Sequence, residues 1–339
     1  MRKWVHSACD DLLRLRNRAG LWGYRSDRGS SVEATALACL GLLGCRQEIP
    51  LQKIAGEVMR VSKWLAAMQN PDGSLGVCPV LPKPGWATPY AILLWSALDT
   101  LAMERKRAAA WLLAQNGLPL PPPDVGRSPF GHDTTLVGWP WIENTHSWLE
   151  PTALAILALG RLAILEHPRV DDGMRVIIDR ALPHGGWNYG NTVVFGRELR
   201  PQPGPTGMAL LALATRASKR RPREVDQGIE YLGQILPGVT APLSLGWGVL
   251  GLRAWDAAPP AAQDWLSQSH ASVAGRCDSA VGLGLLLLAG GERALELLGA
   301  RATIPVTGSA EGPSSDRGHD ERLEDRVPNL LDRLRDYQA

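Results

Sequence analysis

The chain has 339 residues, of which 45% are hydrophobic, and a formal net charge of +2. This length suits one large domain or two ordinary ones, and the hydrophobic fraction is enough for a sizeable core. This net charge is too small to suggest a nucleic-acid-binding protein, and the one dense basic cluster, KRRPR at 219–223, is expected to be a solvated loop, so we expect no nucleic acid among its partners.

Neither a membrane span nor a secretion signal is expected. The apolar run at residues 281–289 falls short of the ~18 residues that a membrane-spanning helix needs. Residues 1–18 are charged throughout and lack the apolar core of a signal peptide. None of the five cysteines forms a CxxC pair, which favours reduced thiols. We therefore expect a cytoplasmic protein.

Two kinds of helix alternate along the chain. The outer kind has an apolar stripe between charged residues, whereas the inner kind is apolar on all sides and is therefore expected to be buried. In chain order, the outer and inner helices of each pair are predicted at 1–19 and 32–44, 51–68 and 88–103, 105–115 and 150–166, 172–181 and 205–216, 224–236 and 243–255, and 261–269 and 278–290.

Six such pairs predict an all-α fold, an (α/α)6 toroid with an inner ring of helices inside an outer ring. Because a single pair cannot bury its own apolar face, the pairs are expected to pack as one domain over residues 1–300. Residues 301–339 are expected to form a disordered linker followed by a short C-terminal helix. That helix is predicted to dock on the toroid or on a protein partner, through the apolar stripe Val327, Leu330, Leu331 and Leu334.

The densest group of polar and aromatic residues lies at 139–162. Its first half is a loop, and its second half is an apolar helix that opens at Glu150. If the helix extends back to His146, the two side chains share one face and suit metal binding or a proton relay. The alternative is an acid stabilised by the helix dipole beside a hydrogen-bonded loop histidine. Glu143, in the same loop, is a further candidate acid.

The motifs QNPDGSLG at 69–76 and HGGWNYG at 184–190 resemble the repeats of the prenyltransferase/squalene-oxidase repeat proteins. This family includes squalene and hopene cyclases, other class II terpene cyclases and the β subunits of protein prenyltransferases. The resemblance covers about residues 5–290. It implies an α/α toroid whose central cavity is closed at one end and lined by the N-termini of the inner helices, with an isoprenoid or another long apolar molecule as the ligand.

The catalytic motifs of that family are absent. The chain has no DxDD run of the kind with which class II cyclases protonate their substrates. It also lacks the DxC spacing with which prenyltransferase β subunits bind zinc. The nearest pair is Cys277 and Asp278, adjacent and in reverse order, at the predicted start of the last inner helix. If this pair stands in for the zinc-binding pair of the family, zinc or magnesium is a candidate cofactor, with Cys277 and Asp278 as candidate ligands.

The remaining candidate residues each have a functional and a structural interpretation. Glu33 occupies the first turn of the first inner helix, where it either faces the cavity or complements the helix dipole. His184 and its neighbouring aromatic residues either contact a ligand or brace a helix end. Aromatic faces also stabilise carbocations. The residues expected to bind substrate are Glu33, Trp139, Trp141, Trp148, His184, Trp187, Tyr189 and Trp247.

Three functions stay open at this point. The first is an enzyme that binds and transforms an isoprenoid in the central cavity, with Glu150 or Glu143 as the acid and His146 as its partner. The second is a non-catalytic toroid that binds a peptide or protein, with the C-terminal tail contributing. The third is a zinc-dependent prenyltransferase. An apolar substrate also makes peripheral contact with a membrane a possible interaction.

Overall fold

The computed structural model describes residues 2–25, 29–121, 130–216, 221–277 and 279–300. These residues form six pairs of α-helices, a four-residue helix, a short 3₁₀ helix and one β hairpin. The outer helices are α1 (Lys3–Arg14), α3 (Leu51–Ala67), α5 (Ala102–Ala114), α7 (Pro168–Asp179), α9 (Arg223–Ile235) and α11 (Ala262–Val273). The inner helices are α2 (Val32–Gly44), α4 (Thr88–Ala97), α6 (Leu149–Arg161), α8 (Pro203–Ala214), α10 (Pro242–Arg253) and α12 (Ala280–Gly290).

The minor elements sit at the edges of these pairs. The 3₁₀ helix η1 (Leu236–Gly238) extends α9. The hairpin strands β1 (Val193–Val194) and β2 (Arg197–Glu198) pair in antiparallel fashion, with Val193 opposite Glu198. The four-residue helix α13 (Ala294–Leu297) follows the last pair.

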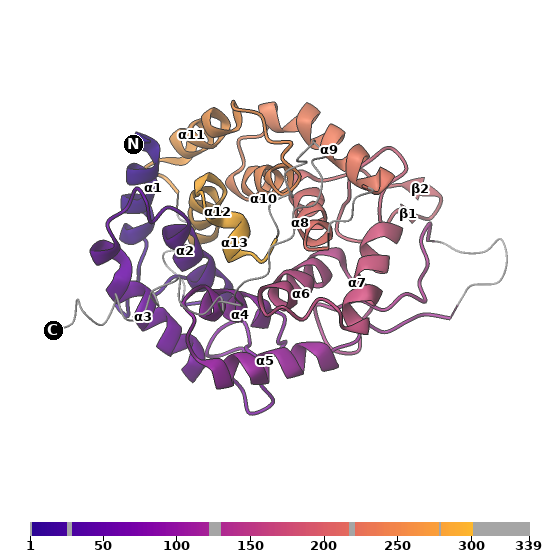
Figure 1. Ribbon diagram of the computed structural model, residues 1–339, viewed down its shortest axis with the longest axis horizontal. Coiled ribbons are helices and arrows are strands. Elements are labelled where there is room, and N and C mark those ends of the chain that lie inside the picture. The colour runs from indigo at the N-terminus through magenta and orange to yellow at the C-terminus, as the bar shows by residue number, and fades with distance from the viewer. Residues whose placement is uncertain (1, 26–28, 122–129, 217–220, 278, 301–339) are drawn as a thin grey trace, which may run out of the picture.

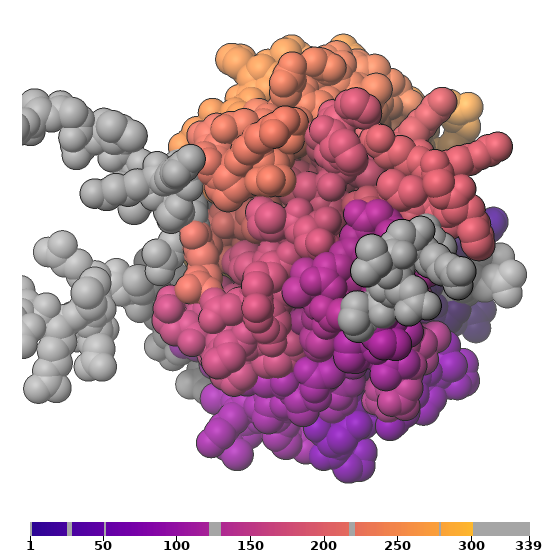
Figure 2. Space-filling view, turned by 90° about the vertical axis from the view of Figure 1, so that its right-hand side faces the viewer, coloured from indigo at the N-terminus to yellow at the C-terminus, as the bar shows by residue number. Residues whose placement is uncertain are grey.

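The inner helices form a closed ring inside the outer helices (Figure 1). Each inner helix packs against the next, and α12 packs against α2, which closes the circle. Seen from the side that carries α7 and the hairpin, consecutive pairs pack edge to edge from violet to orange (Figure 2). The structure thus confirms the predicted all-α architecture of six helix pairs. In the part of the chain described, no helix is long and apolar enough to cross a membrane.

Glycines allow the closest contacts in this ring. A Cβ atom on Gly41 of α2 would lie 2.3 Å from the carbonyl oxygen of Gly284 on α12. A Cβ atom on Gly207 of α8 would lie 2.1 Å from the carbonyl oxygen of Trp247 on α10. Any side chain at these two positions would therefore push two inner helices apart.

The helix α13 lies inside the ring (Figure 1). It contacts α2, α4, α10 and α12, near the C-terminal ends of the inner helices. Its residues Ala294 and Leu297 are fully buried. The opposite end, where the inner helices begin, carries no such helix in the described part of the chain, and we call it the open end.

Several helix ends differ from the sequence prediction, among them Arg14 of α1, Arg161 of α6 and Val273 of α11, and two others have a clear local cause. The inner helix α4 stops at Ala97 rather than near residue 103, because Asp99 and Leu101 adopt positive φ angles and turn the chain into α5. The outer helix α7 starts at Pro168 rather than at residue 172. The imidazole of His167 accepts a hydrogen bond from the Arg169 N–H, and proline suits the first helical position.

A hydrogen-bonded brace recurs in four of the pairs. In the loop before each inner helix, one backbone N–H donates to a threonine hydroxyl of that helix, as Trp139 does to Thr152 at 3.0 Å. The indole N–H of Trp139 donates to the Leu112 carbonyl of the preceding outer helix at 2.7 Å. The other three residue pairs with this backbone bond are Trp22 with Thr35, Leu75 with Thr88, and Trp187 with Thr206. In the three braces that contain a tryptophan, the indole bond also ties the loop to the outer helix of its own pair.

Candidate active site

Two acidic side chains lie at the open end of the ring, near enough for the charge of Glu33 to act on Glu150. Glu33 lies in the first turn of α2, and Glu150 lies in the first turn of α6. Between these helices stands α4, which carries Tyr90 in its own first turn. Each acid comes two residues before the threonine that braces its helix, so the two acids occupy equivalent positions in their repeats.

Two tyrosines hold Glu33. The Tyr90 hydroxyl donates a hydrogen bond to Glu33 Oε1 at 3.1 Å, and Tyr90 itself is buried. Tyr24, from the loop before α2, makes a second hydrogen bond to the same carboxyl group. Glu33 and Glu150 are only half-buried. Both acids therefore border space that solvent, and so a ligand, can reach.

The surroundings of the two acids favour their protonated forms. Burial raises the pKa of Glu33, although the hydrogen bonds from Tyr24 and Tyr90 oppose this effect. Burial, followed by the charge of Glu33, raises the pKa of Glu150 to about 7. Burial and then the charges of Glu33 and Glu150 raise the pKa of Tyr90 well above its usual value. No positive charge contributes to any of these three shifts.

This arrangement separates the roles of the two acids. Glu33 receives hydrogen bonds that stabilise a carboxylate, whereas the Glu150 pKa is raised by burial and by Glu33, with no hydrogen bond contributing. Of the two, Glu150 is thus the better place for a bound proton near neutral pH. A carboxyl group in this state is a proton donor, and its conjugate base can stabilise a cation formed beside it.

His146 does not pair with Glu150 as the helical spacing predicted. The helix α6 begins at Leu149, so His146 lies in the preceding loop and the two residues do not share a helix face. Its ring instead contacts Trp148, with the ring centroids 4.5 Å apart. Burial lowers the pKa of His146, and Glu150 has no part in that shift. Metal binding or a proton relay by this pair depended on a shared helix face, and His146 and Glu150 have none.

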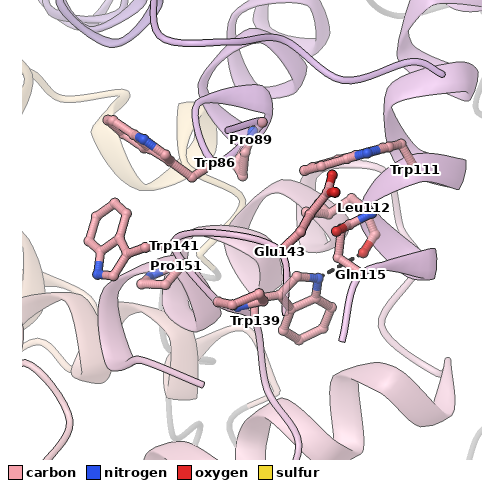
Figure 3. A pocket seen from close by; sticks show the side chains of 11 residues that line it. Trp86, Pro89, Trp111, Leu112, Gln115, Trp139, Trp141, Glu143 and Pro151 are labelled. Carbon is pink, nitrogen blue, oxygen red and sulfur yellow. Dashed lines mark hydrogen bonds between the residues drawn. The ribbon is translucent and has the colours of Figure 1, made fainter. Parts of the chain in front are cut away.

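Glu143 lies apart from the acid pair. It lines a recess between the starts of α4 and α6 and the outer helix α5, together with Trp86, Trp111 and Trp141 (Figure 3). Its carboxylate is half exposed and lies 3.9 Å from the Lys83 ammonium group.

The predicted aromatic residues fall into three groups. Trp139, Trp187 and Trp247 are buried, and the indole N–H of Trp187 donates to the Ile177 carbonyl at 2.7 Å. Because these three side chains are buried, a structural role is favoured for them over contact with a ligand. Trp141 and Trp148 are half-buried at the open end. His184 and Tyr189 are exposed, and His184 lies 3.8 Å from a carboxylate oxygen of Glu198.

The candidate metal ligands do not form a cluster in the described part of the chain. The thiol of Cys277 lies 3.6 Å from the Ser279 carbonyl oxygen, and Ser279 caps α12. Asp278 lies outside the described residues. Among the residues described, no group of three or more His, Cys, Asp or Glu side chains is placed to hold a metal ion.

Sequence reasoning did not single out Tyr24 and Tyr90. A signal for Tyr90 was present in its position relative to the threonine of its brace. Tyr90 lies two residues after that threonine, whereas Glu33 and Glu150 lie two residues before theirs, so in terms of the repeat the positions are four apart. Positions four apart in a helix share one face, so Tyr90 is expected on the same helix face as the two acids. Tyr24 follows the bracing Trp22 by two residues, as Trp141 follows Trp139 and Tyr189 follows Trp187.

The all-α ring of six helix pairs is similar in fold to type II terpene cyclases. No model of a known protein family matches this sequence. No curated protein matches it either. The likeness therefore comes from the structure and shows the fold alone.

The matching solved structures include type II terpene cyclase MstE from Scytonema without ligand. It shares 18% sequence identity with this chain and has a TM-score of 0.54, and the match covers 78% of each chain. A variant of MstE in complex with geranylgeranyl dihydroxybenzoate matches at 15% identity and a TM-score of 0.54, over 80% of this chain and 77% of MstE. A protein from Actinoplanes matches at 15% identity and a TM-score of 0.53, over 87% and 98%.

Proposed function

We propose that this protein binds an isoprenoid at the open end of the inner ring and isomerises it by acid catalysis, with Glu150 as the proton donor. The observation that carries the proposal is the Glu33–Tyr90–Glu150 cluster. It places a carboxyl group with a pKa of about 7 in partly accessible, largely apolar surroundings. The fold shared with MstE, which binds a geranylgeranyl substrate, supports an isoprenoid as the ligand.

The raised pKa of Glu150 limits which groups of a substrate it can protonate. It keeps the acid protonated near neutral pH, but it also makes Glu150 a weaker donor than an ordinary carboxylic acid. An oxygen atom accepts a proton far more readily than an isolated alkene does. We therefore expect an isoprenoid with an oxygen at its reacting end, such as an epoxide. Proton transfer to that oxygen breaks the C–O bond, neighbouring alkenes supply the electrons for new C–C bonds, and the final cation loses a proton. The product is an isomer of the substrate.

Exposed apolar side chains support delivery of such a substrate at this end. Of the large hydrophobic residues exposed in the described part of the chain, only Met103 lies at the end where α13 lies. The others lie at the open end: Tyr24, Val80, Leu81, Leu118, Leu120, Ile142, Tyr189, Phe195, Ile235 and Leu243. Apolar surface of this kind suits transient contact with a lipid surface that holds the substrate.

The test is turnover of squalene 2,3-epoxide and of squalene by the purified protein and by its Glu150→Gln variant. We expect the epoxide to give cyclic isomers of unchanged mass, detected by gas chromatography with mass spectrometry, at a higher rate than squalene. Glutamine keeps the size of the side chain but cannot donate a proton, so we expect turnover to fall about 100-fold or more.

The matched control is Glu198→Gln, an exposed acid at the same end of the ring. It should leave turnover unchanged. Binding of the epoxide without turnover by the unsubstituted protein would refute the catalytic role and leave a binding protein. Equal turnover by the Glu150→Gln variant would show that another group supplies the proton.

A further inference from the structure

The recess beside Glu143 has the composition of a binding site for a cation. It lies between the two helix rings, because the outer helix α5 supplies Trp111 and the loops before α4 and α6 supply Trp86, Trp141 and Glu143. It is separate from the Glu33–Glu150 cluster, whose residues do not line it. The inference that follows does not depend on the proposed function.

Three half-buried tryptophans stand around one carboxylate in this recess (Figure 3). The rings of Trp86 and Trp141 meet edge to face, with their centroids 5.0 Å apart. Trp111 lies on the other side of the loop, where its ring would be only 2.6 Å from a Cβ atom on Gly85. The Glu143 side chain points toward Trp111, with the Trp86–Trp141 pair on its other side. Aromatic rings and one acid thus line a single recess.

Trp86, Trp111 and Trp141 have no arginine over their rings among the described residues, whereas Trp139, which also lines the recess, lies under Arg169. Among the described residues, the one ion pair of Glu143 is a long contact with Lys83, 3.9 Å away, in which the Glu143 side chain is 44% exposed and the Lys83 side chain 62%. Exposed ion pairs of this kind contribute little, so a ligand cation can compete with Lys83.

The size of the recess favours a small, partly desolvated cation. Its empty space is about 340 Å³ with the open mouth included. An alkylated ammonium group would occupy the mouth, with its methyl groups against the tryptophans. Such a group is attracted to aromatic faces and loses less hydration than a primary ammonium group.

We propose that the recess formed by Trp86, Trp111, Trp141 and Glu143 binds a methylated ammonium group, such as the head of choline. The tryptophans attract the cation through their ring faces, and Glu143 supplies the opposite charge at the mouth. Because the recess is open and shallow, we expect millimolar affinity for the head group alone.

The test is titration of the full chain with choline chloride, followed through the indole N–H signals in ¹H–¹⁵N NMR spectra. We expect a few of the thirteen tryptophan signals to shift with a single dissociation constant. The neutral isostere 3,3-dimethylbutanol has the same shape without the charge, and it should bind at least 5-fold more weakly. Trp141→Leu and Glu143→Gln should each weaken choline binding at least 3-fold. Lys83→Met should strengthen it about 2-fold or more, because the competing cation is removed.

Two control variants match these substitutions. Trp265→Leu replaces a half-buried tryptophan of α11, and Glu198→Gln replaces an exposed acid. Both should bind choline like the unsubstituted protein. Equal binding of choline and the neutral isostere would overturn the proposal in favour of a purely apolar recess. Shifts that the Trp141→Leu and Glu143→Gln variants keep unchanged would place the choline elsewhere and also overturn it.

Discussion

At pH 8, the Glu150→Gln variant is expected to be more stable than the unsubstituted protein by about 3 kcal/mol. The pKa of Glu150 is raised from 4.5 to about 7 in the folded state, and a pKa difference of one corresponds to about 1.4 kcal/mol. The folded state therefore holds the proton more tightly than the unfolded state does. That advantage is complete below pH 4.5 and is lost as the pH rises through 7, so above pH 7 the buried carboxylate destabilises the fold.

The measurement is thermal unfolding of both proteins between pH 5 and pH 8.5. Glutamine does not ionise, so the gain from the substitution should be small at pH 5 and should reach on the order of 5 °C at pH 8. Glu198→Gln, at an exposed acid, should show no such trend. A stability difference that does not change with pH would mean that Glu150 ionises with an ordinary pKa, and the proton-donor role would lose its basis.

Substitution of Gly41 by alanine is expected to destabilise the closed ring by about 3 kcal/mol. The added Cβ atom would lie 2.3 Å from the carbonyl oxygen of Gly284, so α2 and α12 must separate. The contact lies between the first and the last inner helices, where the ring closes. A shift there also moves Glu33, because Glu33 lies in the same helix as Gly41. Urea unfolding monitored by circular dichroism measures the loss.

Gly56→Ala is the matched control, since Gly56 lies in the outer helix α3 and a Cβ atom there would have no neighbour within 4 Å. Alanine should stabilise that helix by about 0.5–1 kcal/mol. If Gly41→Ala were as stable as Gly56→Ala, the close packing of α2 on α12 would be refuted.

The architecture followed from the sequence because its signals are local and repeated. Inner helices such as 280–290 are apolar on every side, whereas outer helices such as 3–14 alternate charged and apolar residues. That contrast decides which ring a helix joins. The helix α13 was not predicted, since a segment of four residues is too short to show a helical period. Residues 301–339, including the predicted C-terminal helix, lie outside the described residues.

The site was only partly predictable for a different reason. Glu33 and Glu150 were recognised because each lies in the first turn of an inner helix, at equivalent places in two repeats. Their proximity depends on how α2, α4 and α6 are arranged around the ring, which no local pattern contains. The error at His146 had a local cause, since the helix starts at Leu149 and a pairing four residues apart needs a continuous helix. The Trp86 contact with Trp141 likewise joins two loops far apart in sequence.

The most direct test of the central claim is native mass spectrometry of isoprenoid binding to Glu150→Arg and Glu198→Arg variants. Squalene 2,3-epoxide is added to each variant and to the unsubstituted protein. The acid cluster is the proposed ligand site, so we predict a one-to-one complex with the unsubstituted protein and with Glu198→Arg. Glu150→Arg, which places a bulky cation in the cluster, should form at least 10-fold less complex while remaining folded. Equal binding by Glu150→Arg, or no complex with the unsubstituted protein, would contradict the account.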